Sequence, residues 1–422
     1  MGVDCLQSTI IRYEKKHITM LVSGLILFGA LIRIVAMYHK PHYFDLSYYV
    51  DWSTGVVGDL FGAYENIPNL DYPPMFLFPL YLVGLILKNT SALSFDPYAM
   101  LALKFWQVFF DVALIWLIYF VAKRRDEIFA VFAAALWAIN PSMIFDSAYW
   151  GQTDAIMIFL LLLSYHLLES KRPVCATVVF VIGCLTKFQT LYFAPVFGLV
   201  LLTDYNWKKF LQCAGAGAGT FFGVFTPFML RSGIDLPIRV YFGGLDMYQM
   251  ASFNAANFFS AIGLNQLEDT TPVLGLITAG NLGNLFLMLA VIFLIIIFFT
   301  AKNRCIWTMA FLFMQTVYML SARMHERYQI PVLLFALMAY LIHRDSRMLG
   351  SFFALTITTL LNQFFVLNWY ISPGSPWISS FQTIILILGL INFALFLFTV
   401  YVSLDILYDY QGLGKNHLES AI

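Results

Sequence analysis

Residues 273–300 read VLGLITAGNLGNLFLMLAVIFLIIIFFT and contain no charged side chain. An α-helix rises about 1.5 Å per residue, so about 20 residues cross the hydrocarbon core of a bilayer, which is about 30 Å thick. The stretch is therefore long enough to span a membrane as a helix. Apolar runs of this kind recur along the chain, and they decide its fold class.

The composition excludes a soluble domain. Of the 422 residues, 60% are hydrophobic, 18% are aromatic and 11% are charged, and the mean hydropathy is +0.78. Soluble domains carry about 25% charged residues. The formal net charge is zero, which argues against nucleic acid as a partner because a phosphate backbone requires a basic surface. The five cysteines form no close-spaced pairs, so they make neither a disulfide framework nor a zinc site.

We predict an all-α polytopic membrane protein that forms a single domain over residues 1–422. The predicted spans lie at residues 17–37, 99–122, 128–145, 155–170, 173–187, 188–203, 210–229, 273–300, 305–320, 328–342, 347–370 and 378–403. Short cytosolic loops are enriched in Lys and Arg. Most of the 24 such residues fall in one set of connections, which we assign to the cytosol together with both termini: Arg12, Lys15, Lys16, Lys123, Arg124, Arg125, Lys171, Arg172, Lys208, Lys209, Lys302, Arg304, Arg344, Arg347 and Lys415.

Two apolar segments need a separate interpretation. Residues 73–88 (PPMFLFPLYLVGLILK) contain three prolines, and as a full span they would invert every later loop. We interpret them as a helix that lies in or dips into the outer leaflet, within a long first outer loop, 38–98, that carries interfacial helices. The short spans 173–187 and 188–203 form a hairpin with Lys187 at its tip, which indicates a cavity there rather than lipid.

With this orientation the polar clusters fall on the non-cytosolic side, at residues 38–72, 146–154, 186–190, 231–272, 321–329 and 368–377. A structural protein has no need for such a concentration. The first outer loop combines many aromatic residues with Asp45, Asp51, Asp59, Glu65 and Asp71. Carboxylates accept hydrogen bonds from sugar hydroxyls and aromatic rings pack on pyranoses, so this loop predicts a sugar site. A solvated loop with interfacial aromatic residues has the same composition.

Two other polar segments have a functional and a structural interpretation. Asp146 and Asp154 flank a turn that contains Trp150, and they either belong to a site or cap helices at the interface. Asn254 and Asn257, in the later outer loop over residues 230–272, could bind substrate hydroxyls or cap a helix.

The basic residues are more specific. Arg323, His325 and Arg327 lie close together between two apolar spans, and because arginine binds phosphate bidentately they predict a phosphate cradle, with a charged loop as the alternative. Lys104 and Asp111 lie two turns apart on one face of the span 99–122. A charge inside a span costs about 2.5–3.5 kcal/mol on insertion scales, so these two side chains either form a structural ion pair or line a cavity.

Taken in order, these segments resemble the GT-C glycosyltransferases, multispan enzymes that take a sugar from a polyprenyl-phosphate carrier. The chain is similar to the dolichyl-phosphate-glucose glucosyltransferases of N-glycan assembly, and to the second GPI mannosyltransferase with its bacterial relatives. The resemblance extends to about residue 331 and rests on Asp45 with Trp52; Leu70-Asp71-Tyr72-Pro73-Pro74; the Lys104 to Asp111 spacing; Asp146 with Trp150-Gly151-Gln152-Thr153-Asp154; Lys187-Phe188-Gln189-Thr190-Leu191-Tyr192-Phe193-Ala194-Pro195; and His325-Glu326-Arg327 with Pro331.

The chain departs from the glucosyltransferase pattern in three places. Trp-Gly-Gln-x-Asp replaces a Gly-His-Phe-Gln core, His-Glu-Arg replaces His-Glu-Lys, and Lys104 stands where the family has an arginine. These differences leave undecided which sugar is transferred. The Asp-x-Asp or Glu-x-Asp metal motif of some GT-C enzymes is not evident in the first outer loop, so we predict no catalytic metal and no cofactor.

The resemblance implies a GT-C-like bundle of about twelve transmembrane helices with hexosyltransferase activity. Mannose or glucose would pass from a polyprenyl-phosphate donor to a lipid-linked or glycan acceptor, with inversion. Asp45 would be the general base, and Arg323, His325, Arg327 and Lys187 would surround the donor phosphate. The residues expected to bind sugar and acceptor are Asp71, Tyr72, Asp146, Trp150, Gln152, Asp154, Gln189 and Glu326.

We expect a multi-pass protein of the plasma membrane if prokaryotic, or of the endoplasmic reticulum if eukaryotic, with its active site on the non-cytosolic side. The alternative is a transporter or lipid-linked-glycan flippase that uses Lys104, Asp111 and Asp146 as a relay. Charge clustered at one end of the spans favours the enzyme. A third possibility, a non-catalytic subunit of an envelope-polysaccharide complex, requires that Asp45 be dispensable.

Overall fold

The computed structural model describes residues 2–39, 43–88, 96–246, 248–371 and 379–409. Lys415 and most of the predicted polar cluster 368–377 lie outside these residues. The described chain is almost entirely helical, with one two-stranded antiparallel hairpin. Its elements are α1 (Gly2–Met37), α2 (Tyr43–Gly58), α3 (Ala63–Asn66), η1 (Pro74–Phe76), α4 (Leu77–Leu87), α5 (Pro97–Ala122), α6 (Glu127–Ala138), α7 (Pro141–Ile144), η2 (Phe145–Trp150), α8 (Asp154–Glu169), α9 (Pro173–Thr186), η3 (Phe188–Phe193), α10 (Ala194–Thr203), α11 (Trp207–Ser232), α12 (Leu236–Asp246), α13 (Phe258–Ala261), β1 (Pro272–Val273), β2 (Ile277–Thr278), α14 (Ala279–Thr300), α15 (Ile306–Leu320), α16 (Ile330–His343), α17 (Ser346–Ile371) and α18 (Phe381–Tyr408).

The prediction of an all-α polytopic membrane protein is confirmed. In the described chain, six helices are long and apolar enough to cross a membrane, namely residues 16–37 of α1 and the whole of α5, α11, α14, α17 and α18. α6 and the segment α7–η2 make a seventh if they count as one span with a bend of 44°. Each of the twelve predicted spans overlaps a helix, but several are too short to cross alone. α15 has 15 residues and α16 has 14, which is less than the bilayer core requires.

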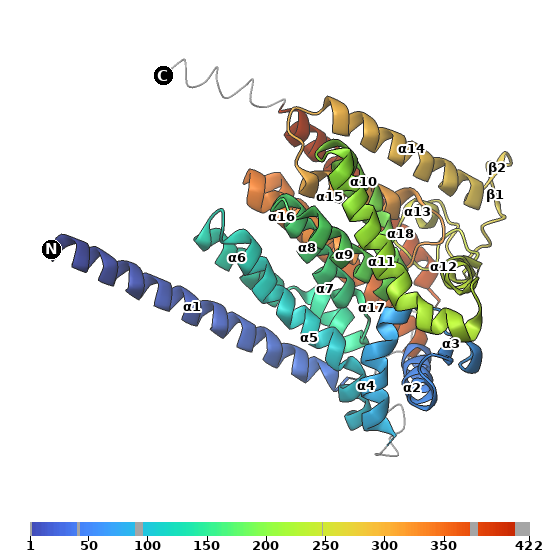
Figure 1. Cartoon of the computed structure of the whole chain (residues 1–422). Coiled ribbons are helices and arrows are strands. Elements are labelled where there is room, and N and C mark those ends of the chain that lie inside the picture. The colour runs from blue at the N-terminus through green and yellow to red at the C-terminus, as the bar shows by residue number, and fades with distance from the viewer. Residues whose placement is uncertain (1, 40–42, 89–95, 247, 372–378, 410–422) are drawn as a thin grey trace.

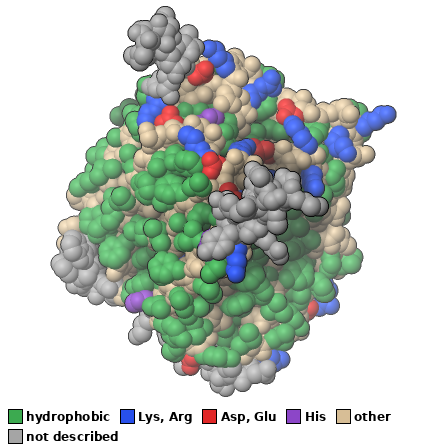
Figure 2. Space-filling model, turned by 90° about the vertical axis from the view of Figure 1, so that its left-hand side faces the viewer, with side chains coloured by type: hydrophobic (Ala, Val, Ile, Leu, Met, Phe, Trp, Pro, Cys, Tyr) green, Lys and Arg blue, Asp and Glu red, His purple; other side chains and the backbone are tan. Residues whose placement is uncertain are grey.

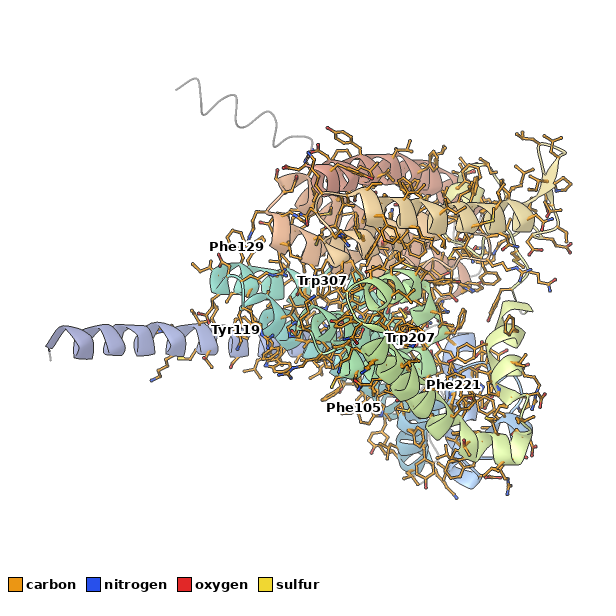
Figure 3. The ribbon with its side chains drawn as sticks, turned by 45° about the horizontal axis from the view of Figure 1, so that its top comes forward. Phe105, Tyr119, Phe129, Trp207, Phe221 and Trp307 are labelled. Carbon is orange, nitrogen blue, oxygen red and sulfur yellow. The ribbon has the colours of Figure 1, made fainter. Side chains whose placement is uncertain are left out.

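The bundle places its connecting helices at one end. The long helices run side by side, and α2, α3 and α12 lie at the end away from the N-terminus (Figure 1). On the face that Figure 2 shows, hydrophobic side chains predominate, and Lys and Arg gather in its upper part. Phe105 and Trp207, labelled in Figure 3, are 50% and 67% exposed, as expected of side chains that meet lipid.

Helix starts follow from short polar side chains that bind free backbone N–H groups. Asp96 accepts from Tyr98 N before α5, Asn140 accepts from Met143 N before α7, and Thr278 accepts from Asn281 N before α14. The last of these corrects a predicted boundary. The span expected to begin at residue 273 begins at Ala279, because residues 272–278 form the hairpin of β1 and β2.

The segment 73–88 does not form a full span. It forms η1 and then α4, whose 11 residues extend for only about 16 Å. α4 packs closely on α2 because Gly84 has no side chain: a methyl group there would lie 1.8 Å from Ser53 O. The contact fixes α2, and with it Asp45, against the bundle.

The charges predicted inside the span 99–122 do not pair with each other. Asp111 accepts hydrogen bonds from Arg33 of α1, from Nε at 2.7 Å and from Nη2 at 3.0 Å, and both side chains are fully buried. Asp111 also accepts from Trp137 Nε1 and Ser147 Oγ. The structural ion pair is therefore Arg33–Asp111, and the charge of Arg33 within an apolar span was the sequence signal for it.

Candidate active site

A cavity of about 460 Å³ lies where five segments meet: the loop before η1, the tip between α9 and η3, the outer loop between α12 and β1, the first turns of α14, and the loop between α15 and α16. The predicted site residues that line it are Asp71, Tyr72, Lys187, Gln189, Arg323, His325 and Arg327. The predicted site residues that do not line it are Asp45, Asp146, Trp150, Gln152, Asp154 and Glu326. All four residues predicted around a phosphate thus face one cavity.

Two cations that line this cavity, the buried Lys187 and the partly buried Arg327, are bound by buried carboxylates. Lys187, the residue after α9, donates to Asp154 Oδ1 over 2.7 Å, and Asp154 is the first residue of α8. Arg327 donates through Nη1 to Glu326 Oε1 over 2.7 Å, and its Nε lies 4.0 Å from Asp154 Oδ2. Since Asp154 and Glu326 are 0% and 2% exposed, these contacts are shielded from water. The carboxylates orient Lys187 and Arg327 toward the cavity.

Arg323 has a different partner, which the sequence did not indicate. Its Nε and Nη2 lie 2.7 and 2.6 Å from Asp269 Oδ2, and Asp269 also lines the cavity. Arg323 has a positive φ of 61°, which is uncommon for a residue with a side chain. The outer loop holds it in this conformation, because Arg323 N donates to Met250 O over 3.1 Å. A phosphate would share this guanidinium with Asp269.

His325 lies in an aromatic enclosure. Its ring centroid is 4.8, 4.7 and 4.9 Å from those of Tyr248, Phe253 and Tyr328. Burial lowers the pKa of His325 well below its ordinary value, and the Arg327 guanidinium lowers it further. The imidazole is therefore neutral near pH 7. It offers a ligand a hydrogen bond rather than the positive charge that the sequence suggested.

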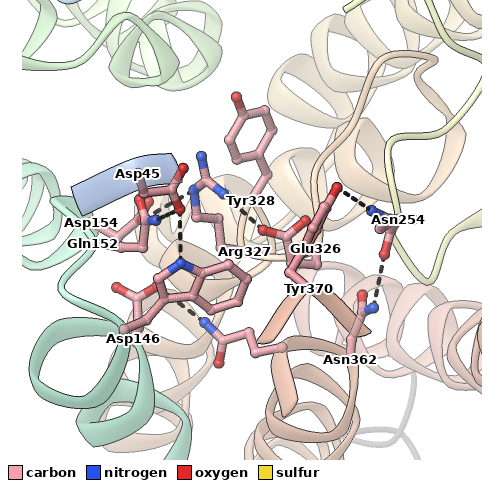
Figure 4. Close-up of polar contacts among 12 residues, drawn as sticks. Asp45, Asp146, Gln152, Asp154, Asn254, Glu326, Arg327, Tyr328, Asn362 and Tyr370 are labelled. Carbon is pink, nitrogen blue, oxygen red and sulfur yellow. Dashed lines mark hydrogen bonds and ion pairs between the residues drawn. The ribbon is translucent and has the colours of Figure 1, made fainter. Parts of the chain in front are cut away.

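Asp45 sits in the first turn of α2, and a turn after η2 orients it (Figure 4). Its Oδ2 accepts hydrogen bonds from Trp150 Nε1 over 2.8 Å and from Gln152 Nε2 over 2.7 Å. The turn forms because Gly151 adopts a φ of 89°, which lets Gly151 N and Gln152 N both donate to Asp146 O. Figure 4 places Arg327 between Asp45 and Glu326. The half-buried Asp45 therefore lies beside Arg327 but does not line the cavity.

Among the carboxyl groups predicted from the sequence to belong to the site, Asp71 is the one that lines the cavity. Its Oδ1 is buried, with no hydrogen-bond partner among the described residues. Burial raises the pKa of Asp71 to about 6, and the charges of Arg327 and Lys187 limit the rise. The hydroxyl oxygen of the neighbouring Tyr72 lies 3.1 Å from Thr153 Oγ1. Gln189, which also lines the cavity, donates to Tyr328 OH over 2.7 Å, and its buried Oε1 has no hydrogen-bond partner in the part of the chain that the structure describes.

Several predicted residues support the fold around the site instead. Asp146 is fully buried and accepts from Gln363 Nε2 of α17 over 3.1 Å. Asn257 caps α13, because its Oδ1 accepts from Ser260 N. Asn254 is fully buried and bonds to Asn265. Asn257 therefore caps a helix, as one interpretation predicted, whereas Asn254 caps no helix in the described chain and instead joins two parts of the outer loop.

Asp269, Tyr248 and Ser321 also line the cavity, but no motif in the sequence singled them out. They come from loops without a regular pattern. The first turns of α14 line it through Gly280, Gly283, Asn284 and Leu287, whose spacing of three and four residues on one helix face was visible in the sequence. Within the described residues, no three His, Cys, Asp or Glu side chains converge into a group that could hold a metal ion.

The fold is similar to the crystal structure of ArnT from Cupriavidus metallidurans bound to undecaprenyl phosphate. The TM-score is 0.52 and the sequence identity 12%, over 92% of this chain and 77% of that chain. The model of the ALG6, ALG8 glycosyltransferase family matches residues 65–240. None of the curated proteins gives a significant sequence match.

The chain therefore shares its fold with ArnT, and over residues 65–240 its sequence is similar to the ALG6, ALG8 glycosyltransferase family. Both likenesses agree with the resemblance to the GT-C glycosyltransferases that the motifs indicate. The matched segment carries Asp71, Trp150, Asp154 and Lys187.

Proposed function

We propose that this chain transfers a hexose, mannose or glucose, from a polyprenyl-phosphate donor to a lipid-linked or glycan acceptor on the non-cytosolic face of the membrane. That membrane is the plasma membrane in a prokaryote and the endoplasmic reticulum in a eukaryote. The donor binds in the cavity, the acceptor approaches from the side of α2, and the chain acts as one domain without a cofactor. Its partners are these two substrates and membrane lipid.

The observation that carries the proposal is the pair of cations that line a cavity of about 460 Å³, the buried Lys187 and the partly buried Arg327. Small-molecule sites commonly enclose about 300–1,000 Å³. A donor of this class is a phosphodiester, with one negative charge beside its sugar. The fixed cations stabilise the charge that develops on the leaving phosphate, where water is largely excluded. Arg323 and the neutral His325 add hydrogen bonds to it.

The reaction is a single displacement. An acceptor hydroxyl oxygen attacks the anomeric carbon, the bond from that carbon to the phosphate oxygen breaks, and polyprenyl phosphate leaves with the electron pair. Asp45 takes the hydroxyl proton as general base. Asp45 lies outside the cavity that Lys187 lines, which supports an acceptor that enters on the side of Asp45 and a leaving phosphate on the side of Lys187. Inversion requires that the acceptor attack from the side opposite to the leaving group. Asp71, Gln189 and Tyr72 contact the sugar.

A relay through Lys104, Asp111 and Asp146 has less support. Asp111 is bound by Arg33, and Lys104 by three backbone carbonyls. Asp146 is fully buried and receives a hydrogen bond from Gln363. A proton or ion relay needs groups that can exchange partners along a path, and these are fixed in separate networks.

Reconstitution tests the proposal. The purified protein is placed in liposomes with polyprenyl-phosphate mannose or polyprenyl-phosphate glucose and a lipid-linked glycan acceptor, and release of polyprenyl phosphate is measured. We expect turnover with one of the two donors and loss of turnover in Asp45→Asn. Passage of a lipid-linked glycan across the bilayer without release of polyprenyl phosphate would instead identify a flippase.

A further inference from the structure

Lys104 is fully buried near the start of α5, and its amine has three hydrogen-bond acceptors. Nζ donates to Met37 O over 3.1 Å, to His39 O over 3.0 Å and to Tyr149 O over 2.7 Å. A lysine ammonium has three donors and no acceptor, so all three donors are used. The acceptors come from two segments that are far apart in the sequence.

One of these segments leads to Asp45. Met37 is the last residue of α1, and Asp45 follows His39 by six residues, in the first turn of α2. Backbone carbonyls at the end of a helix have no partner within the helix, and an amine there satisfies them. Lys104 therefore holds the backbone at the end of α1, from which the chain continues to Asp45.

The other segment holds the side chains that orient Asp45. Tyr149 is adjacent to Trp150 and close to Gln152, the two donors to Asp45 Oδ2. The Lys104 side chain also passes beneath Gly151, where an added methyl group would lie 3.0 Å from Lys104 Cγ. The two segments touch directly as well, since the rings of His39 and Tyr149 stack with centroids 4.7 Å apart.

We propose that Lys104 is a positioning residue for Asp45. By binding carbonyl groups on both sides, it holds the chain that carries Asp45 in register with the turn that carries Trp150 and Gln152. Lys104 is fully buried and is not among the residues that line the cavity, so we assign it no direct contact with the substrate. The role rests on the proposed function of Asp45, whereas the clamp itself is a property of the fold.

The clamp is tested without any substrate. Lys104→Met keeps the length of the side chain and removes all three donors. We expect faster hydrogen–deuterium exchange, followed by mass spectrometry, in peptides covering both the α1–α2 connection and the turn at 145–154. The control is Arg347→Met, which removes hydrogen bonds to Asp345 and Asp405 at the start of α17 and should leave exchange in both peptides unchanged. Unchanged exchange in Lys104→Met would overturn the clamp.

The catalytic consequence is tested with the donor that the wild-type protein turns over. Misplacement of a reacting group by about 1 Å can cost about 10²-fold, so we expect Lys104→Met to lower kcat by about 10–10²-fold with little change in the KM for the donor. Trp150→Phe removes one of the bonds that Lys104 positions. The loss in the double variant should therefore be smaller than the product of the two single losses.

The outcomes separate the possible failures. If no donor is turned over by the wild type, the proposed function fails while the exchange experiment still decides the clamp. A kcat unchanged by Lys104→Met, or losses that simply multiply, would overturn the positioning role. Lys104→Gln, which keeps a shorter donor, replaces Lys104→Met if that variant does not fold. If neither Lys104→Met nor Lys104→Gln folds while Arg347→Met does, Lys104 is required for folding of the whole chain. That result would overturn its local role.

Discussion

Lys187 and Asp154 form an ion pair of 2.7 Å in which both side chains are buried, although 33 residues separate them. The contact joins the tip between α9 and η3 to the start of α8. Lys187 lines the cavity and Asp154 does not. The ammonium group of Lys187 is therefore available to the site, while the carboxylate of Asp154 balances its charge from outside the cavity.

Removing one partner of this pair should destabilise the fold. Asp154→Asn leaves a buried ammonium without its carboxylate, and we expect the free energy of unfolding in detergent to fall by about 3–5 kcal/mol. The matched control is the surface pair Arg231–Asp59, with side chains 57% and 36% exposed. Asp59→Asn should change stability by no more than about 1 kcal/mol. Equal losses in both variants would mean that the Lys187–Asp154 pair is not shielded from water.

Asp45→Asn should lose about 10²–10⁴-fold in turnover, because a positioned general base contributes about that much. Asparagine keeps the size of the side chain and can still meet Gln152, so the fold should persist. Asp51, two turns along α2, is exposed, and Asp51→Asn should retain partial activity. Asp59→Asn should be close to wild type. Turnover of Asp45→Asn at the wild-type rate would remove this base from the mechanism.

Arg327→Lys should impair use of the donor while the chain stays folded. Lysine keeps the charge but loses the planar fork that binds Glu326 and that, in the proposed function, also binds the donor phosphate. We expect a higher KM for the donor and a lower kcat, and a larger loss for Arg327→Ala. Normal kinetics in both variants would show that Arg327 does not contact the donor.

Asp71 gives a pH-dependent prediction. With a pKa of about 6 in the folded protein, above the ordinary 3.8, its contribution to stability is complete below about pH 4 and is lost as the pH rises through 6. Asp71→Asn stays neutral, so it should match the wild type in thermal stability at about pH 4 and exceed it at about pH 7.5. The gain corresponds to at most about 3 kcal/mol. A constant difference across this range would contradict the raised pKa.

The proposed orientation is tested by labelling. Single cysteines replace Leu274 at the hairpin tip, which is 91% exposed, and Lys123 after α5, in a protein without its native cysteines. A membrane-impermeant maleimide applied from the non-cytosolic side should label position 274 and spare position 123. The reverse pattern would move the site to the cytosolic face.

The sequence alone determined the class of protein and most of its helices. Long apolar runs have no stable place in water, so their number and length fixed an all-α membrane fold and located every long helix. Helix length also explains where the predicted spans differ from the helices that are long enough to cross a membrane. α15 and α16 are wrapped by protein, with nearly every residue of both buried, so apolar runs too short to cross a bilayer still resembled spans.

Only the tertiary structure decided which side chains make the site. The sequence named Lys187, Arg323 and Arg327, but their partners Asp154 and Asp269 and the orientation of Asp45 by Trp150 depend on contacts between distant segments. Hydrophobic burial depends on the amount of apolar surface, which a sequence displays directly. Ion pairs and hydrogen bonds depend on distance and angle, which exist only once the helices have packed.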